Sequence, residues 1–310
     1  EYPLVKKMNI LITGGAGLLG GRLVEFFSKT NNVKSTSRKR KNKFLHIDWK
    51  SLKNINKICK NVDVIIHAAG PSYKDCVKNP KSANNFYSNV TKEFIKSASI
   101  SKVKLFIFIS STQVYKNNKY QIMENHKSYS NHPYAKANLI GERKVLNEIK
   151  EDSMKRIILR ISNGAGCPVE KETRCWHLAT NDLCKKAITT KKILLKTNGK
   201  QYRNFIPISE ICRVIKFIIG RKISNKKNII NIVSNKPQKL IDIAKIIKLR
   251  YQKIFKKKIE IIKSKKKDNK KYVSIKSNFL KNNNLNISSN LINEIDQLLR
   301  FCKKNFRFKN

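Results

Sequence analysis

The residues with the clearest chemical signature are Gly14, Gly17 and Gly20, in the sequence TGGAGLLG. They lie between a predicted strand, Asn9–Thr13, and a predicted amphipathic helix, Leu18–Ser28. In that context the first glycine permits a tight turn, the second lets the backbone approach a pyrophosphate, and the third lets the helix pack on the sheet. The free N–H groups at the helix start then bind the phosphates, so the loop predicts a dinucleotide site.

The end of the second predicted strand, Val33–Ser37, indicates which dinucleotide this site prefers. An acidic residue at that place holds the ribose hydroxyls of NAD. Here the sequence reads STSRKR, with Ser37 and Arg38 at the strand end and no carboxylate. Hydroxyl groups and a guanidinium suit the 2′-phosphate of NADP. We therefore expect NADP as the preferred cofactor, with NAD as the alternative.

Short apolar runs alternate with amphipathic stretches through the first half of the chain. Continuous apolar strands separated by helices indicate a parallel sheet that is covered on both faces. The fold class is therefore α/β, a Rossmann-type doubly wound parallel sheet. After the first two strands, further strands are predicted at Phe44–Ile47, Val62–His67, Lys104–Ser110 and Ile157–Ile161.

The second half changes character and predicts a smaller C-terminal α/β substrate-binding region. We place the NAD(P)-binding domain at residues 8–165 and the second region at 166–310, partly interleaved with the first. The predicted elements of the second half are helices at Ser209–Ile219, Leu240–Phe255 and Leu291–Phe301 and a strand at Ile229–Val233. A basic run covers residues 256–277, for which the sequence gives no role.

The composition sets limits on the class of protein. Lys+Arg is 68 and Asp+Glu is 20, a net charge of +48, and most of the excess is lysine. Proteins that read nucleic acids rely on arginine, so we interpret the charge as background composition and expect no nucleic-acid partner. No apolar run approaches the ~20 residues of a membrane span. Seven scattered cysteines without a secretory signal indicate a cytoplasmic protein with reduced thiols, and their spacing predicts no metal site.

Six short motifs follow the glycine loop in order along the chain. They are HAAG at 67–70, NVT at 89–91, SSTQVY at 110–115, HPY at 132–134 with Glu142, LRISN at 159–163, and RNFI at 203–206. Together with the G-x-x-G-x-x-G loop they resemble the extended branch of the short-chain dehydrogenase/reductase superfamily, the NAD-dependent epimerase/dehydratase family. The resemblance extends from Met8 to about Gly220.

The resemblance implies hydride transfer between a sugar carbon and the nicotinamide, with three catalytic positions. Tyr134 matches the tyrosine that gives or takes the hydroxyl proton, and Ser111 matches the residue that binds the sugar oxygen. The family lysine that lowers the tyrosine pKa stands one helical turn later, where this chain has Asn138. Lys136 points away from that face of the helix and is a poor substitute.

The asparagine leaves three readings open: a slow enzyme, an enzyme with a relocated cation, and a catalytically impaired cofactor-binding sensor. Asn138 cannot supply charge, so we expect the pKa of Tyr134 to be higher than in the family. The upstream residues that could replace the cation are His126, Lys127 and His132.

The resemblance also implies the ligand contacts. The family's 4,6-dehydratases carry Asp-Glu where this chain has Thr112 and Gln113, which makes that reaction unlikely here. The substrate contacts implied are Thr112, Asn163 and Arg203. The cofactor contacts are Gly14, Gly17, Leu18, Leu19, Gly20, Ser37, Arg38, Asp48, His67, Ala68, Ala69 and Asn89.

We therefore expect an NAD(P)-dependent nucleotide-sugar epimerase or ketoreductase, which would supply sugars for surface polysaccharide or lipopolysaccharide. The alternative is a sensor or scaffold protein of the same fold. The resemblance further implies a homodimer built on helices around 87–97 and 134–149.

Overall fold

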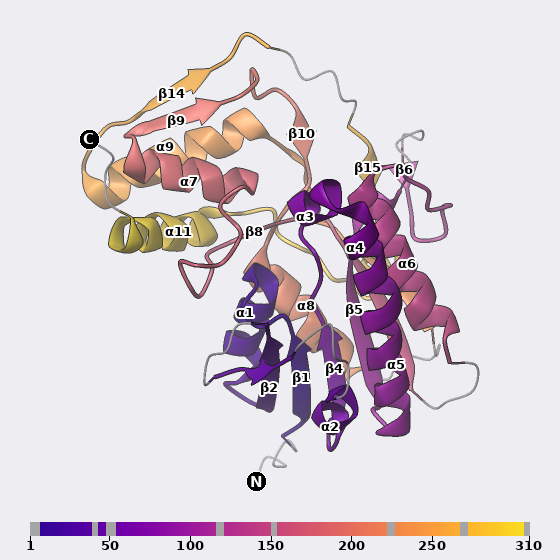
Figure 1. The fold of residues 1–310 in the computed structure, drawn as a ribbon. Helices are drawn as coiled ribbons and strands as arrows, with labels where there is room; N and C mark the ends of the chain where they lie inside the picture. The colour runs from indigo at the N-terminus through magenta and orange to yellow at the C-terminus, as the bar shows by residue number, and fades with distance from the viewer. Residues whose placement is uncertain are drawn as a thin grey trace.

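The structure is a computed structural model that describes residues 7–38, 43–47, 54–115, 121–149, 154–221, 227–266 and 272–306. Its largest element is a parallel sheet (Figure 1). The seven strands are β1 (Asn9–Thr13), β2 (Asn32–Ser37), β3 (Leu45–His46), β4 (Val64–His67), β5 (Leu105–Ser111), β7 (Lys155–Ile161) and β12 (Lys227–Ile232). Their spatial order is β12-β7-β5-β4-β1-β2-β3, so the predicted Rossmann-type parallel sheet is confirmed.

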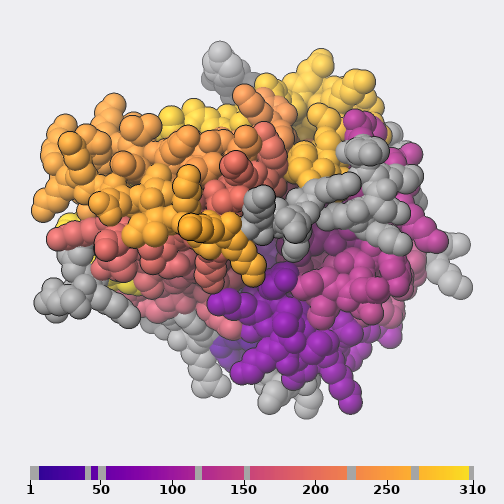
Figure 2. Space-filling model, turned by 90° about the horizontal axis from the view of Figure 1, so that it is seen from above, coloured from indigo at the N-terminus to yellow at the C-terminus, as the bar shows by residue number. Residues whose placement is uncertain are grey.

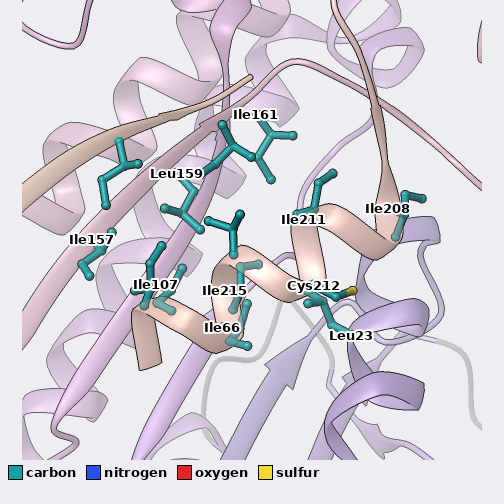
Figure 3. Close-up of a cluster of buried hydrophobic side chains, with 14 of the residues drawn as sticks. Leu23, Ile66, Ile107, Ile157, Leu159, Ile161, Ile208, Ile211, Cys212 and Ile215 are labelled. Atoms are coloured by element: carbon teal, nitrogen blue, oxygen red, sulfur yellow. The ribbon is translucent and has the colours of Figure 1, made fainter. Parts of the chain in front are cut away.

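Alternate residues of the strands supply the two faces of the sheet, because side chains in a strand point to opposite sides in turn. Ile10 and Ile12 of β1 belong to one core, whereas Leu11 between them belongs to the other. The first face packs against α1 (Leu18–Phe27) and α8 (Ile208–Gly220), and Figure 3 shows isoleucines of α8 against the sheet.

The second face is covered by helices from the first half of the chain. The cluster on this side joins Leu11, Ile65 and Phe106 of the sheet to Phe94 and Val145 of the helices. The covering helices are α2 (Ile55–Cys59), α4 (Pro80–Asn85), α5 (Thr91–Ile100) and α6 (Pro133–Asn147). A short helix, α3 (Tyr73–Lys78), and a π-helical turn, η1 (Phe86–Val90), complete the path from β4 to α5, and the 3-10 turn η2 (Thr112–Val114) follows β5.

The sheet order reverses between β1 and β4, because β2 extends the sheet on one side and β5 on the other. In an open α/β sheet, ligands bind outside the carboxyl ends of the strands at such a point. The glycine loop follows β1, residues 67–70 follow β4, and Ser111 ends β5. All three therefore lie along the edge where a ligand is expected.

The second half forms a smaller lobe with its own core, in which Leu183, Ile243 and Leu298 are buried. In Figure 2 its orange and yellow atoms lie beside the purple and magenta atoms of the first half. Its helices are α7 (Ala179–Thr189), α9 (Leu240–Phe255) and α11 (Ile292–Asn305), whereas the short α10 (Asn278–Asn282) packs in the core of the large sheet. The remaining strands pair two by two, as β6 (Gln121–Ile122) with β15 (Ser274–Ile275), β8 (Asn163–Ala165) with β11 (Phe205–Pro207), β9 (Lys192–Leu195) with β14 (Glu260–Lys263), and β10 (Tyr202–Arg203) with β13 (Gln238–Lys239).

The two predicted regions exchange elements. β12, α8 and α10 come from the second range of the chain but complete the sheet and the core of the first. We keep 8–165 and 166–310 as the proposed division, with these three elements crossing it. All seven cysteines are free and buried. Within the described residues there is no helix with the length and apolarity needed to cross a membrane.

Candidate active site

The glycine loop connects β1 to α1 and is closely packed at two glycines. Gly14 has a φ of +76°, and a Cβ there would lie 2.9 Å from the backbone of Ala69. A Cβ on Gly20 would overlap the carbonyl oxygen of Gly14, which already accepts a hydrogen bond from the Gly17 N–H at 2.8 Å. Neither position has room for a side chain, so no Cβ covers the loop backbone at Gly14 or Gly20.

The start of α1 has the features of an anion site. Gly17 is the N-cap residue, no side chain caps the first turn, and no acidic residue stands in it. The first N–H groups of the helix, including those of Leu18 and Leu19, therefore lack side-chain partners and carry the positive end of the helix dipole. The pyrophosphate of a dinucleotide fits this arrangement.

The end of β2 presents hydroxyl groups rather than a carboxylate. Ser35 and Ser37 are each 5% exposed and Thr36 is fully buried. The buried Thr36 hydroxyl has no hydrogen-bond partner among the described residues. Arg38 is exposed at the strand end. Asp48, the predicted adenine contact, lies outside the described residues.

The side chain of His67, a predicted cofactor contact, lies inside the protein. It is fully buried, with Nδ1 at 3.0 Å from the Thr13 hydroxyl and Nε2 at 3.5 Å from that of Thr91. Burial lowers the pKa of His67 to about 3, so the ring is neutral at every physiological pH. The ring joins β4 to β1 and α5, and the cofactor contact of this residue stays a prediction.

The residues around His67 divide into two groups. The Ala69 N–H donates to the Thr13 hydroxyl at 3.1 Å, and the Ala68 carbonyl lies beside the glycine loop. Both alanines are therefore placed where the motif predicts a cofactor contact. Asn89 is exposed, and its side-chain amide donates to Asn85 one helical turn earlier, which gives it a local partner.

The three predicted catalytic positions come together at the start of α6. Pro133 occupies the first turn, and Nδ1 of His132 accepts a hydrogen bond from the Tyr134 N–H at 3.2 Å. The Tyr134 hydroxyl interacts with the side chains of Ser111 and Asn138. The tyrosine therefore lies between the end of β5 and the second turn of its own helix.

Burial raises the pKa of Tyr134, and the neighbouring thiol of Cys76 raises it further. The hydrogen bonds from Asn138 and Ser111 lower it, but the net shift is upward from the ordinary value of about 10. The phenol therefore stays protonated at neutral pH. A protonated phenol donates a proton readily to a forming alkoxide, whereas it is a weak base for removing one.

Asn138 lies where the family lysine would stand, one turn after the tyrosine and on the same face. It is 1% exposed, and its side-chain amide donates to the Tyr134 carbonyl at 2.8 Å. Lys136 is exposed, as expected from its position on the other side of the helix. The asparagine is thus a neutral hydrogen-bonding group inside the site.

Of the three upstream residues that could replace the cation, one lies against Tyr134. His132 contacts the Tyr134 backbone and stacks on Tyr73 with ring centroids 4.5 Å apart. The ring of Tyr73 is 5.9 Å from that of Tyr134. His126 instead accepts a hydrogen bond from the Met123 N–H, and Lys127 is exposed.

A buried ion pair fixes α6 relative to the sheet. Arg160 donates to both oxygens of Glu142, at 3.0 and 2.6 Å, and Ser110 donates to the same carboxylate. The guanidinium also lies over the ring of Tyr115 at 4.7 Å. Because Glu142 is two turns after Tyr134 and Ser110 precedes Ser111, this network holds the two predicted catalytic side chains at a fixed separation.

The predicted substrate contacts are spread over two lobes. Thr112 is buried at the end of β5, in the turn after Ser111. Asn163 is exposed on β8, and its amide donates to the Asn204 carbonyl at 3.0 Å. Arg203 is half-buried on β10, next to the strand that pairs with β8.

Three residues beside Tyr134 carry no motif and are not predicted from the sequence. The Tyr73 ring lies tilted beside that of Tyr134, Cys76 lies near the phenol, and Tyr87 is buried with its hydroxyl close to Gly70. Burial raises the pKa of Tyr87 well above its ordinary range, and Tyr134 and Cys76 raise it further. Only the path of the chain between β4 and α5 brings them to Tyr134.

The sequence profile of the NAD dependent epimerase/dehydratase family matches residues 10–232. An uncharacterized UDP-glucose epimerase of Bacillus subtilis is 24% identical over 240 residues, which cover 69% of this chain and 73% of that protein. A dTDP-D-glucose 4,6-dehydratase of Dictyostelium discoideum is 26% identical over 258 residues, 71% of this chain. The chain spans 58% of the length of that second relative.

Solved structures share the fold at low identity. A UDP-glucose 4-epimerase of Thermotoga maritima with UDP-glucose has a TM-score of 0.77 and 16% identity, covering 97% of this chain and 100% of its own. A UDP-glucuronic acid 4-epimerase of Bacillus cereus in complex with NAD has a TM-score of 0.78 and 19% identity, covering 98% and 99%. At these identities the likeness extends to the fold alone.

Proposed function

The chain belongs to the NAD dependent epimerase/dehydratase family, and we propose that it is a nucleotide-sugar epimerase or ketoreductase. The observation that carries this proposal is that α6 packs on the end of β5 and places Tyr134 near Ser111, at the sheet edge that also holds the glycine loop. A proton-carrying phenol and a hydroxyl donor next to a dinucleotide site suit the interconversion of an alcohol and a ketone.

Each residue has a defined part in the proposed reaction. Ser111 binds the sugar oxygen and polarises the carbonyl, and Tyr134 transfers the proton to or from the same oxygen. The nicotinamide, when bound, supplies or accepts the hydride. Asn138 holds the Tyr134 carbonyl and hydroxyl in place without adding charge.

We propose NADP as the preferred cofactor and NAD as the alternative. The uncharged, hydroxyl-rich end of β2 and the exposed Arg38 support NADP, because no carboxylate among the described residues there would repel a 2′-phosphate. The B. cereus relative is named as binding NAD, which supports the alternative. We also propose that the protein acts in the cytoplasm as a homodimer, in the supply of sugars for surface polysaccharide or lipopolysaccharide.

A 4,6-dehydratase is not proposed, although one relative carries that name. Removing water from the sugar needs an acid and a base next to the catalytic serine. Thr112 and Gln113 occupy those positions and have no ionisable group.

Asn138 favours a second candidate, a catalytically impaired NAD(P)-binding sensor of the same fold. The raised pKa of Tyr134 weakens it as a base, and no upstream lysine lies against it among the described residues. A sensor would bind the dinucleotide through the glycine loop but convert no sugar.

Calorimetric titration of NAD⁺, NADP⁺ and NADPH, followed by a panel of nucleotide sugars assayed by NMR, separates these functions. Dinucleotide binding with sugar conversion supports the enzyme, and binding without conversion supports the sensor. Absence of dinucleotide binding contradicts both.

A further inference from the structure

The segment between β8 and α7 lies against the glycine loop, and we infer that it covers the dinucleotide site and retains the cofactor between turnovers. We call residues 168–178 the strap. Figure 1 shows this loop descending from the small lobe beside α1. The inference rests on the proposed function and deepens it, because a cofactor that stays bound favours epimerisation over net reduction of the sugar.

The middle of the strap touches the glycine loop itself. Thr173 is 5% exposed, and its hydroxyl donates to the carbonyl of Ala16 at 3.4 Å. Val169 lies over the first turn of α1, since a Cβ on Gly21 would be 3.4 Å from its side chain. The strap therefore lies against the helix start that we assign to the pyrophosphate.

One ion pair fixes the strap at the adenosine end. Glu170 pairs with Lys43, whose ammonium lies 5.2 Å from the centre of the Phe44 ring. A Cβ on Gly15 would meet both Phe44 and Ser35, so this aromatic ring packs at the junction of the glycine loop and β2. The pair thus joins the strap to the segment that borders the adenosine site.

A second ion pair fixes the strap at the catalytic end. Arg174 donates to Asp75 at 2.8 Å, and the two side chains are 64% and 33% exposed. Asp75 is also held by the capping box of α3, in which it bonds to the Ser72 N–H and hydroxyl. Tyr73, two residues before Asp75, lies with its ring 5.9 Å from that of Tyr134, so this pair joins the strap to the helix beside the predicted catalytic tyrosine.

These attachments join four parts of the chain that are distant in sequence. Both ion pairs are partly exposed, so each is individually weak and sensitive to salt. Opening the strap requires breaking both pairs and the Thr173 hydrogen bond together. A dinucleotide in the site would therefore leave slowly compared with one in an open cleft.

Slow release selects between the proposed reactions. Epimerisation removes a hydride and a hydroxyl proton from one sugar carbon and returns both, so the dinucleotide ends each turnover in its starting form. Reduction of a ketosugar by NADPH leaves one NADP⁺ per turnover, which has to exchange before the next cycle. The strap therefore favours epimerisation of a nucleotide sugar over its net reduction.

The test measures the dissociation rate of NADH or NADPH by displacement with excess oxidised dinucleotide. Arg174→Gln and Glu170→Gln, alone and combined, remove the strap's half of each pair. The matched control is Arg213→Gln, which breaks an exposed ion pair with Glu210 inside α8. The dissociation rate of the double variant should rise about three- to tenfold, the range expected of two partly exposed pairs, and that of the control should not change.

A variant in which the two charges of one ion pair are exchanged distinguishes loss of the pair from a folding defect. Lys43→Glu combined with Glu170→Lys restores the pair with reversed charges and should return the dissociation rate toward that of the native protein. Equal dissociation rates in the native protein and the double variant overturn the inference while the proposed function stands. Failure of the native protein to bind any dinucleotide contradicts the proposed function itself.

Discussion

The glycine loop and the start of α6 border the same sheet edge, but they depend on different kinds of interaction. The loop is fixed by steric contact, because a Cβ on Gly14 or Gly20 would strike neighbouring backbone. The pKa of the Tyr134 phenol is set by its surroundings, because burial and Cys76 raise it and the side chains of Asn138 and Ser111 lower it. We therefore expect the glycine loop to tolerate little substitution, and an exchange at residue 138 to change the pKa of Tyr134 without moving the tyrosine.

The largest expected effect is on turnover at the tyrosine. Tyr134→Phe removes the proton carrier but leaves the glycine loop intact, so turnover should fall about 10²- to 10⁴-fold. Dinucleotide affinity, measured by calorimetry, should stay within about twofold of the native value. Tyr129→Phe is the matched control, because that exposed hydroxyl bonds to Asn131. A Tyr134→Phe protein with native turnover contradicts the assignment.

The ion pair behind the tyrosine should matter most for stability. Glu142→Gln leaves the guanidinium of Arg160 buried without its countercharge, which costs about 3–5 kcal/mol in the free energy of unfolding. The control on the same helix is Glu148→Gln, whose lysine partners are partly exposed, with an expected cost of at most about 1 kcal/mol. Denaturant unfolding compares the two, and equal losses would refute the special role of Glu142.

Gly14, which has a positive φ, tests whether steric contact fixes the glycine loop. Gly14→Ala strains the backbone by about 1–2 kcal/mol and meets Ala69, so dinucleotide affinity should fall about 10- to 100-fold. Gly220→Ala is the control, because nothing lies within 4 Å of a Cβ there. Native affinity in the Gly14→Ala protein would show that the loop does not position the cofactor.

Asn138 tests whether neighbouring side chains set the pKa of Tyr134. Asn138→Lys places a cation beside the phenol, which favours the phenolate and lowers the pKa of Tyr134. Each unit of that shift should raise sugar oxidation at neutral pH about tenfold, because the fraction of phenolate rises by that factor. The exposed Lys136→Asn substitution should leave turnover unchanged. An inactive Asn138→Lys protein that still binds dinucleotide supports the sensor.

The sequence predicts the features that depend on local spacing. The glycine loop, the parallel strands and the shared face of Tyr134 and Asn138 follow from residues within one or two turns of each other, and the structure confirms this geometry. The contacts around the tyrosine differ, because α3 and η1 bring Cys76 and Tyr87 there through tertiary packing.

Two further features required the structure. The His67 ring is buried among aromatic side chains of α5 and β5, a tertiary environment that the local sequence around the HAAG motif does not indicate. Arg174 and Asp75 are 99 positions apart and carry no motif, so their ion pair has no sequence signal.

The most direct test of the account is the pH dependence of sugar oxidation by the native protein, followed by nicotinamide absorbance in a single turnover. The pKa of Tyr134 is raised, so the oxidation rate should climb with pH up to and beyond about pH 10 without a plateau. In the Asn138→Lys protein the plateau should appear at lower pH. A native plateau near neutral pH would contradict the account, because it would require a cation at the phenol that the described residues do not supply.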